Sequence, residues 1–146
     1  MSAVASDTGG DASRWRTLTG LLTVLLMLLV AHDVDHVVNE GRLYELPVGF
    51  WIFLPFQYGA FLAVLVMVRR RAPNAATLVA ALGATTVVGF AVSHALPFAF
   101  APYEDPPAFS WVLVYVPMAV AATVFAVALR LRSATGATGR PEAMRA

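Results

Sequence analysis

The chain has 146 residues, of which 59% are hydrophobic and only 13% are charged. Soluble domains carry about 25% charged residues and cannot bury so much apolar surface, so the composition predicts an integral membrane protein. The chain has no cysteine, which excludes disulfides and thiolate metal ligands. All ten basic residues are arginine, which indicates GC-rich codons and favours a prokaryotic source.

Four segments with little or no charge follow one another along the chain, at residues 17–38, 48–68, 75–98 and 109–129. Each has the length of about 20 residues that crosses the hydrocarbon core as a helix. The short sequence "RRRAPN" between the second and third segments predicts a tight turn between antiparallel helices. We therefore expect an all-α protein with a four-helix up-down transmembrane bundle at 14–132. The small, polar ends at 1–13 and 133–146 are expected to be disordered cytoplasmic tails.

The arginines predict the orientation of these helices in the plasma membrane. Nine of them would lie on one side of the bilayer and only Arg42 on the other. Because positive residues accumulate on the cytoplasmic side, both termini are expected to be cytoplasmic. The same rule explains the arginines without any nucleic-acid partner.

The first segment ends in the polar sequence "AHDVDHVVNEGR". At 100° per residue, its polar residues fall within an arc of about 160°, and the valines and Ala31 fill the other side. His32 and His36 stand four residues apart, and Glu40 continues the same face. This pattern favours a helix with one face towards partner helices, although a helix end anchored among lipid headgroups is the alternative.

Further polar residues are expected at the same depth in the outer half of the bilayer. His94 lies about one turn before the expected end of the third segment, and three prolines interrupt the outer halves of the helices, at Pro55, Pro97 and Pro117. The same half holds four more polar side chains: Gln57, Tyr58, Ser93 and Tyr115. Polar, irregular helix is tolerated at this depth where it lines a cavity or packs against protein.

These residues predict a metal site with His32, His36, His94 and Glu40 as ligands. Histidines at i and i+4 bind one ion from one helix face, and a nearby carboxylate commonly holds such a ring in place. The supporting residues are expected to be Asp33, Asp35, Asn39, Gln57, Tyr58, Ser93 and Tyr115. Nitrogen and oxygen ligands without sulfur suit zinc, iron, manganese, nickel or copper(II).

Two other functions remain open from the sequence. Two histidines on facing helices could hold haem in a membrane electron carrier, although four carboxylates are unusual in a haem pocket. Alternatively, the protein is a non-catalytic accessory subunit whose outer acids pair with a membrane partner, or it forms a homo-oligomer. Known enzyme motifs do not decide the question, because H-E-x-x-H, a Gly-rich phosphate loop and a catalytic Ser–His pattern are all absent from the sequence.

Overall fold

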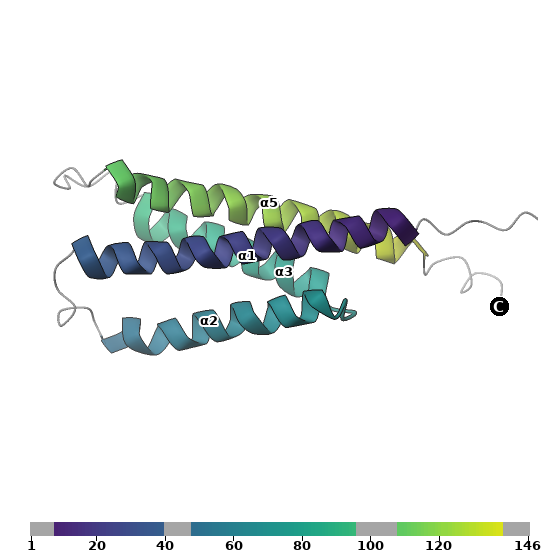
Figure 1. Ribbon diagram of the computed structural model, residues 1–146, viewed down its shortest axis with the longest axis horizontal. Helices are drawn as coiled ribbons and strands as arrows, with labels where there is room; N and C mark the ends of the chain where they lie inside the picture. Colours follow the sequence, from purple (N-terminus) through teal and green to yellow (C-terminus); the bar gives the residue numbers. More distant parts are fainter. Residues whose placement is uncertain (1–7, 40–47, 96–107, 139–146) are drawn as a thin grey trace, which may run out of the picture.

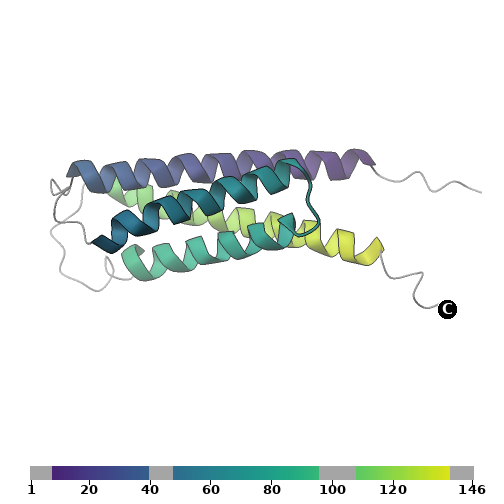
Figure 2. The ribbon, with the colours of Figure 1, turned by 90° about the horizontal axis from the view of Figure 1, so that it is seen from below.

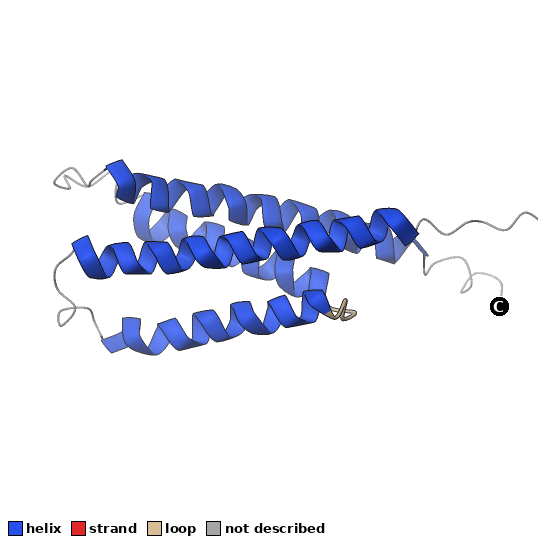
Figure 3. Ribbon diagram, viewed as in Figure 1, coloured by secondary structure: helices blue, strands red, loops and turns tan. Residues whose placement is uncertain are grey.

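The computed structural model describes residues 8–39, 48–95 and 108–138, and every regular element in these ranges is helical (Figures 1 and 3). In chain order, the α-helices are α1 (Thr8–Asn39), α2 (Val48–Arg69), α3 (Ala75–Phe90) and α5 (Ala108–Thr138). A π-helical turn, η1 (Ala91–Ala95), directly continues α3. The four helices lie side by side in both views (Figures 1 and 2).

All four helices are long and apolar enough to cross a membrane. The spans run over Gly10–Val38, Ile52–Arg69, Ala75–His94 and Phe109–Ala134. Large apolar side chains are exposed on every helix, including Met27, Phe56, Val88 and Phe109. An exposed apolar surface on all sides is expected of a helical membrane protein, and the predicted all-helical membrane class is confirmed.

Two helices extend beyond the apolar segments that define the predicted spans. Helix α1 begins at Thr8 and α5 ends at Thr138, so that each continues into sequence expected to be a tail. The 32 residues of α1 correspond to about 48 Å, which exceeds the ~30 Å of hydrocarbon. Hydropathy marks where a helix leaves the lipid, whereas the helix itself continues as long as its backbone hydrogen bonds do.

The core is built from apolar residues spaced alternately three and four positions apart. Helix α1 contributes Leu18, Leu22, Leu25 and Leu29, which are almost completely buried. The facing stripe on α5 is equally buried and consists of Val114, Pro117, Ala121, Val124, Ala128 and Leu131. This spacing keeps one face of each helix on its neighbours, as in coiled coils.

Helices α3 and α5 approach each other closely at Gly83. A Cβ atom on Gly83 would lie 2.9 Å from the carbonyl oxygen of Ala121 and 3.1 Å from the amide nitrogen of Phe125. Small residues of this kind allow close backbone packing in membranes. Helix α2, by contrast, contacts α1 and α3 but not α5 within the described residues.

The link between α2 and α3 is as short as the sequence predicts. The amide of Ala72 donates to the carbonyl of Met67, and the amide of Arg71 donates to that of Val68, both at 3.0 Å. Arg71 has a φ of 50°, so this is a Schellman cap with arginine in the left-handed position where glycine is usual.

Candidate metal centre

His32 continues the buried leucine stripe of α1. It follows Leu29 by three residues, and only 6% of its surface is exposed. Its ring packs against that of Phe90 on α3, with 4.7 Å between the ring centroids. His36, one turn further along the same face, is half-buried. The expected inward-facing end of the first helix is therefore present.

His94 comes from the π-helical turn η1. Its ring contacts Phe90, four residues earlier, at a centroid distance of 5.4 Å. A π-helical turn widens the helix and re-aims its side chains, and such turns are frequent at functional sites. The sequence predicts that His94 lies near the histidines of the first helix, but it does not predict this turn.

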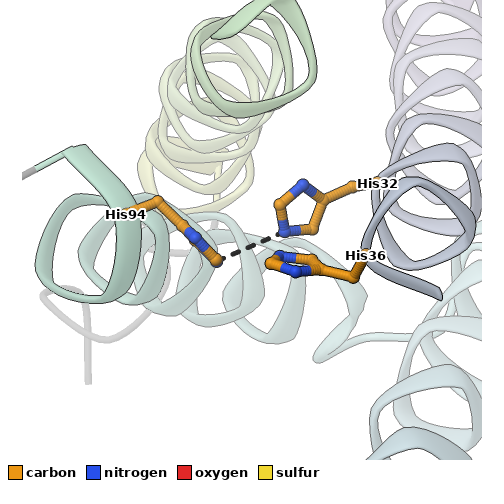
Figure 4. Close-up of side chains that lie close together, drawn as sticks. All are labelled: His32, His36 and His94. Carbon is orange, nitrogen blue, oxygen red and sulfur yellow. Dashed lines mark hydrogen bonds between the residues drawn. The ribbon is translucent and has the colours of Figure 1, made fainter. Parts of the chain in front are cut away.

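The three histidine rings converge from two helices (Figure 4). The Nε2 atoms of His32 and His94 are 3.2 Å apart, and one nitrogen from each of the three rings lies within 4.8 Å of the others. The ring centroids of His36 and His94 are 5.2 Å apart. A tetrahedral ion with Zn–N bonds of 2.0–2.1 Å requires its ligand nitrogens to be roughly 3.3 Å apart, so small side-chain rotations suffice.

One nitrogen of the group has no hydrogen-bond partner among the described residues. The Nδ1 atom of His32 is buried and makes no hydrogen bond to any described residue. Neither Asp33 nor Asp35 therefore holds this ring through Nδ1, which differs from the usual carboxylate–histidine arrangement. Most buried polar atoms in proteins have a hydrogen-bond partner, and water or an ion would supply one here.

Asp33 instead joins α1 to α2. Its carboxylate accepts a hydrogen bond from the hydroxyl of Tyr58. Both side chains are half-buried. The pair attaches α2 to α1 beside the histidines. It therefore helps to position α2 and does not hold a histidine ring in place.

The other predicted site residues are distributed unequally. Gln57 and Ser93 line the same cavity as the histidines. Asp35 is half-buried on α1. Tyr115 is 44% exposed on α5, stacks on Trp111 and does not line the cavity. The side chain of Asn39, and Glu40 altogether, lie outside the described residues.

The histidines open into a cavity of about 620 Å³ between α1, α2 and α3. Beyond the histidines, its walls are mainly aromatic, aliphatic and small side chains: Leu29, Phe53, Leu54, Phe56, Ala60, Phe61, Leu82, Thr85, Thr86, Gly89 and Phe90. Sequence reasoning missed Phe90, which contacts two of the histidines. Its position four residues before His94 is the signal that could have identified it.

Fold and site together define a multi-pass helical membrane protein with three histidines placed to hold a metal ion. No family model matches the chain, and neither a curated protein nor a solved structure matches it.

Proposed function

We propose that the protein binds a transition-metal ion in the outer half of the bilayer through His32, His36 and His94. The observation that carries this proposal is the convergence of three imidazole nitrogens within 4.8 Å. His94 comes from η1 and the other two histidines from α1, so the approach of His94 to them is not a consequence of local spacing. Zinc, iron, manganese, nickel and copper(II) all accept such a ligand set.

Three histidines suit an ion that takes part in chemistry better than a purely structural ion. Structural zinc sites use four protein ligands, whereas catalytic sites use three and leave one position for water or substrate. Such an ion would supply a Lewis acid and an activated water molecule. The adjoining cavity offers room for a substrate, so we propose a metal-dependent membrane enzyme or a protein that handles metal ions.

The contact between His32 and His94 favours an ion over haem. In a bis-histidine haem, the iron and the plane of the porphyrin lie between the two axial imidazoles. In this protein the two Nε2 atoms are 3.2 Å apart, which leaves no space for a macrocycle between them. Haem binding would require the two helices to separate.

The proposed topology is an up-down bundle in the plasma membrane with both termini in the cytoplasm. The α2–α3 link lies near the same end of the bundle as the start of α1 and the end of α5 (Figures 1 and 2). This end carries the sequence's arginine clusters, including Arg69, Arg70 and Arg71. The histidines lie towards the opposite end, which would face outwards.

Elemental analysis and an absorption spectrum of the purified protein test the proposal. We expect about one transition-metal ion per chain and no Soret band. A Soret band would show that the bound cofactor is haem and not a single metal ion. A protein without metal after purification, and without zinc uptake in equilibrium dialysis, would contradict the metal site and favour an accessory subunit.

A further inference from the structure

We infer that the cavity accepts a single-chain lipid directly from the bilayer, with an oxygen-bearing head group at the histidines. The head-group part of this inference rests on the proposed metal site. The cavity part rests only on the shape and exposure of the residues that line it.

The cavity is long and has unlike ends. On α3 and η1, its lining residues run from Leu82 to His94, which corresponds to about 18 Å along the helix. The three histidines and Ser93 gather at one end, whereas Leu82 and Phe61 lie towards the other. The hydroxyl of Thr86 donates to the carbonyl of Leu82 and is thus not free to bind a polar ligand as a donor. An elongated volume with a polar end and an apolar end fits an amphiphile.

The cavity opens sideways between α2 and α3. On α1, the lining residues Leu29 and His32 are buried, and Asp33 and His36 are half-buried. Six of its lining residues on α2, α3 and η1 are exposed instead: Phe53, Phe56, Ala60, Thr85, Gly89 and Ser93. Because all six belong to the membrane spans, this opening would face lipid rather than water.

The size and charge of the cavity favour a lipid with one chain. A volume of about 620 Å³ lies within the ~300–1,000 Å³ of ordinary ligand sites and far exceeds the space of one ion. Among the described residues that line the cavity, Asp33 is the only charged one apart from the histidines, and none is an arginine that could bind a phosphate. A carboxylate head, by contrast, is a common ligand for zinc and for the other metals that suit three histidines, so a fatty acid is the simplest occupant.

Photolabelling in liposomes tests this inference. Zinc-loaded protein in phosphatidylcholine vesicles is irradiated with a palmitic acid analogue that carries a diazirine in its chain. We expect labelling of α2 and α3 peptides that excess palmitate suppresses. Gly89→Phe should lower this suppressible labelling roughly tenfold, because its side chain would occupy the cavity.

Gly59→Phe is the matched control, since Gly59 is also exposed and does not line the cavity. A Cβ atom on either glycine meets nothing within 4 Å, so both positions have space at the backbone for the start of a side chain. Gly89→Leu provides a smaller obstruction should the phenylalanine disturb folding. Equal labelling of the Gly89 and Gly59 variants would identify the bound lipid as part of the general lipid shell and overturn the inference.

Two further measurements separate this inference from the proposed function. Hexadecane competing as well as palmitate would overturn the docking of the head group at the histidines. Metal content is measured on the same samples, and Gly89→Phe should retain its ion. Cavity-specific labelling in a protein that binds no metal would support the lipid cavity and contradict the metal site.

Discussion

At the scale of single residues, the histidines form a group in which each ring contacts the other two. The ring centroid of His32 lies 4.6 Å from that of His36 and 4.7 Å from that of His94. Loss of any one ring would leave two nitrogens, which hold an ion far more weakly than three. We therefore expect His32→Ala, His36→Ala and His94→Ala each to lose most of the bound metal, as measured by elemental analysis.

Tyr115→Phe is the control for this series, because Tyr115 lies outside the cavity. Its metal content should equal that of the wild type. Circular dichroism should show the same helical content in all four variants, since the apolar spans determine insertion. Retention of wild-type metal by His94→Ala would show that η1 contributes no ligand, and the two-helix site would be wrong.

The hydrogen bond between Tyr58 and Asp33 leads to a second residue-level prediction. Tyr58→Phe leaves a half-buried carboxylate without its donor, and should lower the unfolding free energy by roughly 1 kcal/mol, in the range measured for hydrogen bonds between membrane helices. Asp33→Asn keeps an oxygen acceptor and should cost less. Thermal unfolding in detergent compares the stabilities of the two variants with that of the wild type. An unchanged unfolding midpoint of Tyr58→Phe would show that the pair does not stabilise the α1–α2 contact.

At the scale of elements, the stripe that buries α1 also positions the site. Leu18, Leu22, Leu25 and Leu29 lead directly to His32 with the same spacing of three and four residues. Part of the site was therefore predictable, because helical periodicity decides which residues share a face. The amphipathic end of α1 follows from the sequence in this way.

The π-helical turn and the contact between Asp33 and Tyr58 were not predictable in the same way. A π-helical turn depends on the balance between backbone hydrogen bonds and packing against other helices, and hydropathy does not report that balance. The partner of Asp33 depends on which helix lies next to α1, and that is a tertiary property.

The close approach of α3 and α5 predicts opposite effects for two glycine substitutions. Gly83→Ala places a Cβ atom 2.9 Å from a backbone oxygen and should destabilise the protein by about 1–3 kcal/mol. Gly20→Ala meets open space on α1 and should be neutral or stabilising, since alanine favours helix over glycine by up to ~1 kcal/mol. Thermal unfolding of the two variants in one detergent is the measurement. Equal midpoints would contradict the tight α3–α5 contact.

At the scale of the whole molecule, the sequence predicts the number of spans better than their packing. Hydrocarbon requires about 20 apolar residues per helix, so spans are visible in the composition alone. Which helices contact one another is decided by the shapes of their side chains. Gly83 and Ala121 bring α3 onto α5, whereas α2 remains attached only to α1 and α3 in the described part of the chain. The sideways opening of the cavity follows from that arrangement and has no counterpart in a hydropathy pattern.

The orientation of the bundle decides which compartment the histidines face. The chain has no cysteine, so single substitutions give an unambiguous labelling signal. Ala108→Cys, at the start of α5, should react with a membrane-impermeant maleimide in intact cells, because the proposed topology puts this end outside. Ala72→Cys, in the α2–α3 link, and Ala137→Cys, near the end of α5, should react only after permeabilisation. Labelling of Ala72→Cys in intact cells would reverse the bundle, and the metal site would then face the cytoplasm.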